Sequence, residues 1–275
     1  MRRTQLVPIL AACSTCLASV ASTIGFEPPE YVVGDPLPAG WTIYNPSNAQ
    51  VGVTTSDPSA GSQCLAVGYN GGGAAHSAAR YAIDVEPSGS ATVSFDVRPA
   101  PFITDFNFFS YGRAAVFNDI SVGETVLFFT REFGQNRIKA QVPGDEAILG
   151  AFVPGTYYRV EFGYDWDANT RTIRVETLAG GLIGEHVFSN TSDRTLKLVD
   201  LGGGGAVGFF NHYDELLIDD GAVLGDLDGD GVVGGSDLGV LLAAWGTTDP
   251  VADLDGSGMV DGGDLGALLA DWSAG

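Results

Sequence analysis

The stretch YRVEFGYDWDANTRTIRVE, residues 158–176, alternates between apolar and polar side chains on both sides of a short turn rich in Asp and Asn. Every second residue of its first half is apolar, and Ile173 and Val175 continue the alternation after the turn. A period of two places apolar side chains on one face of a strand, and Asp and Asn favour turns between strands. The stretch therefore predicts a β-hairpin with one buried face and one polar face.

The same period of two extends over most of residues 25–221 and is unbroken over Ala91–Val97. Runs rich in β-branched and aromatic residues predict further strands at 41–44, 63–69, 79–85, 114–117, 125–132, 137–141, 206–211 and 216–219. Turn clusters such as SDPSAGS, EPSGS and LGGGG separate these runs. Half-polar strands must bury their apolar faces against one another, so we expect a mainly β fold, a jelly-roll β-sandwich, for residues 25–221.

The charge of the chain limits the partners that it can bind. The formal net charge of the 275 residues is −21. Because phosphate binding requires clustered Lys and Arg, this balance argues against nucleic acid and against an anionic membrane surface as partners. It is compatible with cations, neutral glycans or a basic protein surface.

Residues 1–21 have the features of a secretory signal peptide. A basic start and an apolar stretch precede small residues and a cleavage site after Ala21. We therefore expect a secreted protein that is extracellular or held at the cell surface. A bacterial lipoprotein is the alternative, because Leu10–Cys13 resembles a lipobox that would place a lipid on Cys13. No later stretch is long and apolar enough for a membrane span, and removal of the signal leaves Cys64 alone.

The C-terminal region contains an acidic sequence that occurs twice. GDLDGDGVVGGSDLGVLLAAWG at 225–246 and ADLDGSGMVDGGDLGALLADWS at 252–273 share one spacing. In each copy, numbered from Asp226 and from Asp253, a glycine stands at the sixth position and an aspartate at the twelfth. Residues 223–275 contain ten aspartates and no Lys, Arg or Glu, so these carboxylates lack a basic counter-charge in their own region.

This spacing is that of an EF-hand calcium loop. Ca²⁺ takes about six to eight oxygen ligands, which such a loop supplies at alternating positions and at its twelfth residue. The ligands predicted in the first loop are Asp226, Asp228, Asp230, Asp237 and the backbone carbonyl of Val232. Those predicted in the second loop are Asp253, Asp255, Ser257, Asp261, Asp264 and the backbone carbonyl of Met259. Two copies at one spacing favour two bound Ca²⁺ ions over a metal-free acidic turn.

A mainly apolar run follows each acidic loop. Leucine and tryptophan recur there at helical spacing, at Leu238, Leu241, Leu242 and Trp245 and again at Leu265, Leu268, Leu269 and Trp272. The pattern predicts two short helices that pack on each other, since neither can bury its apolar face alone. We expect both tryptophans to belong to this small core.

Two loop–helix repeats with no helix entering the loop resemble a type I dockerin domain, here over residues 225–275. The resemblance implies two half EF-hands, two Ca²⁺ ions and docking onto a cohesin-like module of a scaffold or cell-surface protein. It places partner recognition at the tenth and eleventh loop positions, which are Gly235, Ser236, Gly262 and Gly263. The family often has hydroxyl-bearing residues at these positions, whereas three of the four are glycine in this chain.

The sandwich region resembles a second family. Its opening FEPPEYVVG with the following GW, its hairpin YDWDANTRTIRV and its final DELLIDD are similar to jelly rolls of the concanavalin A-like (laminin G-like) superfamily. Together the two resemblances imply a non-catalytic module that could bind polysaccharide, attached through a calcium-binding dockerin-like domain. The alternative is a secreted glycoside hydrolase or polysaccharide lyase whose site lies in the jelly roll.

A catalytic site is not apparent in the sequence. Jelly-roll glucanases of the laminarinase type carry an ExDxxE run on one strand, and the nearest run here, Glu161–Asp167, has a different spacing. The three histidines, His76, His186 and His212, are isolated and lack zinc-ligand spacing. Four aromatic residues could stack on sugar rings, although a place in the core is the default expectation for Trp41, Tyr44, Trp166 and Tyr213.

Overall fold

The computed structural model describes residues 22–44, 47, 49–69, 76–87, 89–100, 112–118, 123–132, 134–189, 195–204, 210–221, 223–229 and 232–272. These residues form two compact units with a boundary after Gly221. The predicted signal peptide with Cys13 lies outside the described residues, as do Asp230 and Gly231 of the first acidic loop.

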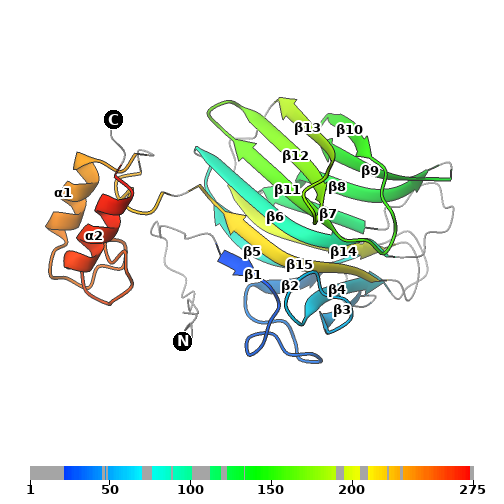
Figure 1. Ribbon diagram of the computed structural model, residues 1–275, viewed down its shortest axis with the longest axis horizontal. Coiled ribbons are helices and arrows are strands. Elements are labelled where there is room, and N and C mark those ends of the chain that lie inside the picture. The colour runs from blue at the N-terminus through cyan, green and yellow to red at the C-terminus, as the bar shows by residue number, and fades with distance from the viewer. Residues whose placement is uncertain are drawn as a thin grey trace. The chain divides into compact units, whose positions relative to one another are not determined.

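The larger unit consists of two antiparallel sheets (Figure 1). The eight-stranded sheet has the order β13 (Leu182–Ser189), β12 (Thr170–Thr177), β11 (Tyr158–Asp165), β6 (Ser90–Arg98), β15 (Phe210–Asp219), β4 (Cys64–Tyr69) and β3 (Ala49–Thr54), with β1 (Ser22–Ile24) also paired to β15. The seven-stranded sheet has the order β10 (Asp145–Gly150), β9 (Gln135–Val142), β8 (Gly123–Glu132), β7 (Gly112–Asn118), β14 (Leu196–Gly204), β5 (His76–Val85) and β2 (Trp41–Tyr44). The prediction of a mainly β fold of the jelly-roll sandwich type, followed by two small helices, is confirmed.

The hairpin at 158–176 forms as predicted, with β11 and β12 as its strands. Val160 pairs with Val175 and Phe162 with Ile173, so the apolar side chains of both strands share the buried face. Asp165 closes the turn by accepting a 2.7 Å hydrogen bond from the backbone N–H of Ala168. The carboxylate therefore acts in turn formation, as its place in the sequence suggested.

Side chains from the inner faces of both sheets form one core. Phe95 lies near its centre, with its ring centroid 5.7 Å from that of Phe162 and 6.0 Å from that of Tyr213, both in edge-to-face geometry. Edge-to-face rings of this kind add to the free energy gained by burying apolar area. Phe129 and Leu201 of the opposite sheet belong to the same core.

The opening FEPPEYVVG segment packs into this core. Phe26, Tyr31 and Trp41 are buried, and the Trp41 indole N–H donates a 3.0 Å hydrogen bond to the Tyr31 hydroxyl. Tyr213 is also buried, and Trp166 is half-buried against Tyr164. Of the four aromatic residues considered for sugar stacking, Tyr44 is the one whose side chain is exposed, at 43%.

Five strands were not predicted, namely β1, β3, β10, β13 and β14. Residues 210–211 and 216–219, from two separately predicted strands, belong to the single strand β15, and residues 206–209 lie outside the described residues. Gly202, Gly203 and Gly204 of the LGGGG run belong to β14 rather than to a turn, and Gly205 lies outside the described residues. A Cβ on Gly203 would lie 2.3 Å from the carbonyl oxygen of Val67, so glycine is needed where the two sheets approach closely. A β-bulge between Leu196 and Leu198 also breaks the period of two in this strand.

The smaller unit contains the two predicted helices, α1 (Gly235–Ala243) and α2 (Gly262–Ala270). Its core is small and consists of Val233, Leu241, Ala252, Val260 and Leu268, with Leu238 and Leu265 partly buried beside it. None of the described helices is long and apolar enough to cross a membrane.

The prediction that both tryptophans are core residues is wrong. Trp245 is 45% exposed and Trp272 is 38% exposed, and Leu242 and Leu269 are more exposed still. Each helix has nine residues, and the single buried leucine that it contributes, Leu241 or Leu268, is enough to cover the small core. The other half of each predicted apolar stripe is left on the surface.

Candidate metal centre

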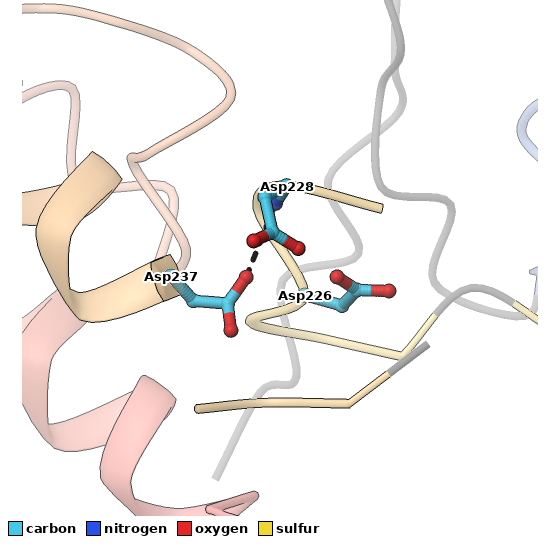
Figure 2. Close-up of side chains that lie close together, drawn as sticks. All are labelled: Asp226, Asp228 and Asp237. Carbon is cyan, nitrogen blue, oxygen red and sulfur yellow. Dashed lines mark hydrogen bonds between the residues drawn. The ribbon is translucent and has the colours of Figure 1, made fainter. Parts of the chain in front are cut away.

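Three aspartates of the first acidic loop converge on one point. One carboxylate oxygen each from Asp226, Asp228 and Asp237 lie within 4.8 Å of one another (Figure 2). Asp226 and Asp228 come from the loop, whereas Asp237 belongs to the first turn of α1 and is fully buried. The spacing of one, three and twelve therefore brings side chains from both ends of the loop together.

Backbone amides hold the Asp237 carboxylate in place. Its Oδ1 accepts hydrogen bonds from the N–H groups of Leu227 (2.7 Å) and Asp228 (3.1 Å), and its Oδ2 accepts one from Gly234 (2.6 Å). Burial by itself raises the pKa of Asp237, but these amides outweigh burial and set the pKa below its ordinary value. The loop thus keeps a buried carboxylate charged next to two further carboxylates.

The second loop repeats this arrangement 27 positions later, with Asp253, Asp255 and Asp264. The fully buried Asp264 accepts hydrogen bonds from the N–H groups of Asp255 (3.0 Å) and Asp261 (2.7 Å). Burial again raises the pKa of Asp264, but the amides lower it by more, so that the net shift is below the ordinary value. Two independent segments therefore fold around an aspartate triad in the same way.

The glycine at the sixth position of the second loop makes a sharp turn. Gly258 has a φ of +93°, a backbone conformation that residues other than glycine rarely adopt. Its N–H donates a 2.8 Å hydrogen bond to the Asp253 carboxylate. Asp253 and Asp255 also both accept hydrogen bonds of 3.0 Å from the N–H of Ser257. The turn thus orients the carboxylates at the first and third positions.

The predicted ligands outside the two aspartate triads have different surroundings. Ser257 donates a hydrogen bond of 3.1 Å to the carbonyl oxygen of Met259, so these two lie together in the second loop. Asp261 caps α2 by accepting a 2.8 Å hydrogen bond from Gly263 and is not part of the triad. The backbone of Val232 is described, whereas Asp230 lies outside the described residues. The ligand role of each of these residues stays a prediction.

The donor set decides which ions could bind. All the converging side-chain atoms are carboxylate oxygens, which suit hard divalent cations rather than thiol- or imidazole-seeking metals. Without a cation, three carboxylates this close repel one another, and no Lys or Arg lies in residues 223–275 to offset them. The residues therefore fit a cation site at each loop.

Replacement of Asp237 by Asn should weaken the first site. The N–H₂ group of the new Asn side chain would face backbone N–H donors, and this mismatch costs about 1–3 kcal/mol of folding free energy. The site would also lose one negative charge. We expect calorimetric titration to show one Ca²⁺ bound in place of two and the melting temperature of the smaller unit to fall. Asp271→Asn, an exposed residue of the same region, is the matched control. Two unchanged sites in Asp237→Asn would contradict this role.

No protein-family model matches the chain, and no curated protein matches it. Among solved structures, it is similar to lectin II from Ulex europaeus, with 11% identity and a TM-score of 0.48, over 73% of this chain and 97% of the lectin. An endo-beta-1,4-glucuronan lyase from the fungus Trichoderma reesei has 16% identity and a TM-score of 0.48, over 68% of this chain and 93% of the lyase. A sialidase has 14% identity and a TM-score of 0.48, over 74% of this chain and 19% of its own. Because these similarities are low, function has to be inferred from the residues of this chain.

The four predicted partner-binding residues lie on the surface. Gly235, Ser236, Gly262 and Gly263 are exposed in the first turns of α1 and α2. A larger exposed feature of these helices was not predicted, namely the pairs Leu242 with Trp245 and Leu269 with Trp272. Their helical spacing was visible, but exposure depends on how little of the stripe the small core needs.

A second group of acids lies on the outer face of the eight-stranded sheet. Asp96 and Asp214 are buried there beneath the segment 55–62, and Ser59 Oγ lies 2.8 Å from Asp96 Oδ2 and 3.1 Å from Asp214 Oδ2. Arg159 donates two hydrogen bonds to Asp96, and the N–H groups of Ser59 and Ala60 donate to Asp214. Within the described residues these acids do not form a group that could hold a metal, and their partners give them a structural role.

Protonation of His212 should destabilise the sandwich in acid. Burial and, to a smaller extent, the neighbouring Arg98 guanidinium lower the pKa of His212 from 6.5 to about 4. The unfolded chain therefore binds this proton at higher pH than the folded chain, and stability is lost as the pH falls from 6.5 towards about 4. His212→Gln should show a smaller fall in melting temperature over this range than the parent.

Comparison with the parent isolates this effect. Burial raises the pKa of Asp214, so its protonation has the opposite effect on stability as the pH falls. This effect is the same in the parent and in His212→Gln. His186→Gln on the edge strand β13 is the matched control. Equal pH dependence of the parent and His212→Gln would contradict the assignment.

Proposed function

We propose that this chain is a secreted calcium-binding protein in which the smaller unit attaches the β-sandwich to a partner protein. The partner would be a cohesin-like module of a scaffold or of a cell-surface protein, as the resemblance to dockerins implies. This attachment would hold the sandwich at the partner protein. The setting would be extracellular and related to polysaccharides.

One observation carries the proposal. Two aspartate triads with identical spacing, Asp226 with Asp228 and Asp237 and Asp253 with Asp255 and Asp264, are each organised by backbone amides around a buried twelfth-position carboxylate. Oxygen donors in this arrangement favour Ca²⁺, which tolerates the irregular geometry of a flexible loop better than Mg²⁺ does. Binding of two ions would offset the mutual repulsion of these carboxylates.

The exposed side chains of the two helices support an attachment role. Leu242 and Trp245 on one repeat, and Leu269 and Trp272 on the other, are large apolar residues that the small core does not bury. Tryptophans on a surface are costly to leave in water and are enriched among the residues that dominate binding at protein interfaces. Each repeat therefore offers an apolar anchor in addition to the exposed tenth and eleventh loop positions.

We propose a non-catalytic role for the sandwich, because each of its described buried carboxylates binds a basic side chain or loop amides through at least one oxygen. Arg159 pairs with Asp96, loop amides bind Asp214, and Arg80 pairs with Asp200. A glycosidase or lyase needs acids or bases that reach the substrate, and no described feature favours that alternative over a binding module.

The test of attachment uses the purified mature chain and a panel of immobilised cohesin modules, in buffer with Ca²⁺ and in buffer with EDTA. We expect calcium-dependent binding to at least one module, and at least a tenfold loss of affinity in the double variant Trp245→Ala, Trp272→Ala. The matched control is Ile148→Ala with Val187→Ala, two exposed apolar residues of the sandwich. Binding that persists in EDTA, or that survives loss of both tryptophans, would overturn the proposed attachment.

A further inference from the structure

The outer face of the seven-stranded sheet contains a charged pair in an apolar setting. Thr42, Arg80, Asp200, Ala115 and Val126 are neighbours in register across β2, β5, β14, β7 and β8, so their side chains share one face. The alternate residues on these strands, such as Ala79, Val199, Ala114 and Leu127, belong to the main core. The row with Arg80 and Asp200 therefore faces away from the core.

This outer face is not an ordinary solvated sheet surface. Ala115, Phe117 and Val126 are buried on it and form a second apolar cluster, with Phe128 and Leu198 packed alongside. A polar group placed next to such a cluster has a higher desolvation cost than one on an open sheet. Charged residues in this position therefore require an explanation beyond solubility.

Asp200 is the central polar residue of the face. It is fully buried, and its Oδ2 accepts a 2.8 Å hydrogen bond from Nε of Arg80. Its Oδ1 is also buried and has no hydrogen-bond partner among the described residues. An acceptor that is buried and unpaired costs about 1–3 kcal/mol, which a donor from a bound molecule would offset.

Arg80 is held rigidly by this aspartate and by two rings. Its guanidinium carbon lies 4.1 Å from the ring centroid of Tyr44 and 5.4 Å from that of Phe117. Its side chain is 24% exposed, and no described residue accepts a hydrogen bond from its Nη atoms. The guanidinium thus presents fixed N–H donors beside the exposed ring of Tyr44, which costs little entropy when a ligand binds.

We propose that Arg80, Asp200 and Tyr44 form a binding site for a neutral saccharide on this face. Hydroxyl groups of one sugar residue accept hydrogen bonds from the Nη atoms of Arg80, and the apolar C–H face of the ring packs near Tyr44. Because Asp200 is fully buried, the donor to its Oδ1 is small, either one hydroxyl group or a water molecule held by the sugar. Asp200 acts as a positioning residue for Arg80.

The charges of the site favour a neutral sugar over an acidic one. Arg80 and Asp200 cancel each other, and the whole chain carries a formal net charge of −21, which repels anions. A carboxylate can accept hydrogen bonds from Arg80 but has no proton to donate to Asp200. A hydroxyl group does both, so it satisfies the donor and the acceptor of this site together.

The test is affinity electrophoresis of the intact mature chain, in Ca²⁺ buffer, in gels that contain neutral polysaccharides (a β-glucan, a xyloglucan and a galactomannan) or polygalacturonate. We expect retardation by at least one neutral polysaccharide, and at least a tenfold weaker interaction for Arg80→Met and for Tyr44→Ala. Arg80→Met also removes the partner of Asp200, so Tyr44→Ala provides the variant that keeps the ion pair intact. The matched controls are Arg174→Met on the outer face of the other sheet and Trp245→Ala in the smaller unit.

Each outcome separates this site from the proposed attachment. Unchanged retardation in Tyr44→Ala and Arg80→Met, retardation by polygalacturonate alone, or none by any polysaccharide would overturn the saccharide site. Loss of binding in EDTA would also contradict it, because the site contains no predicted calcium ligand. Failure of cohesin binding would leave the saccharide site unaffected.

Discussion

Addition of EDTA to the mature chain is expected to unfold residues 225–272 and to leave the sandwich folded. The core of the smaller unit consists of five buried residues, Val233, Leu241, Ala252, Val260 and Leu268, which is too few to offset the conformational entropy of the region. Without a cation, its two aspartate triads add repulsion, because residues 223–275 carry ten aspartates and no basic residue. Folding should therefore be coupled to calcium binding.

Hydrogen exchange read by mass spectrometry measures this result in each unit separately. With EDTA, amides of α1 and α2 should exchange fully, while those of β6 and β11 keep the protection they have with Ca²⁺. Far-ultraviolet circular dichroism should show the matching loss of helical signal, and excess Ca²⁺ should restore it. A helical signal that EDTA leaves unchanged would contradict coupled folding.

Phe95→Ala should have the largest effect of any single substitution in the sandwich. Phe95 is 1% exposed and packs against Phe162 and Tyr213, so truncation leaves a cavity between the two sheets. Such Phe→Ala changes cost about 3–5 kcal/mol of unfolding free energy. For a unit of this size we expect the melting temperature to fall by roughly 10 °C.

The substitution also tests whether the two units fold independently. Calcium titration of Phe95→Ala below its melting temperature should give the same two sites as the parent, since the metal ligands lie in the other unit. Ile148→Ala, at a side chain that is 57% exposed, is the control and should melt within about 1 °C of the parent. A loss of less than 1 kcal/mol in Phe95→Ala would show that Phe95 is not central to the core.

Periodicity predicted the strands that have one polar face and failed where both faces are buried. The hairpin β11–β12 was predicted because every second residue is polar. In β14, by contrast, Leu198 packs on the outer cluster while Val199 and Leu201 enter the main core, so no alternation is visible. The glycine run at the end of β14 was predicted to be a turn. Glycine is required at Gly203 because the Val67 carbonyl of a strand distant in the sequence lies close to it.

The candidate sites show the same limit. The aspartate triads were predicted because their ligands lie within twelve residues and their spacing alone sets the geometry. Asp200 and Arg80 are separated by 120 positions and meet through the pairing of β14 with β5, which no local pattern reveals. The exposure of Trp245 was missed for a related reason, since it depends on the size of a core rather than on helical spacing.

Calorimetric titration of the mature chain with Ca²⁺, together with Asp226→Ala and Asp253→Ala, tests the central claim most directly. The parent should bind two ions, and each variant should bind one, because each substitution removes the first-position carboxylate of one loop only. Absence of calcium binding in the parent, or two intact sites in either variant, would contradict the assignment of these loops as calcium sites and the proposed attachment with it.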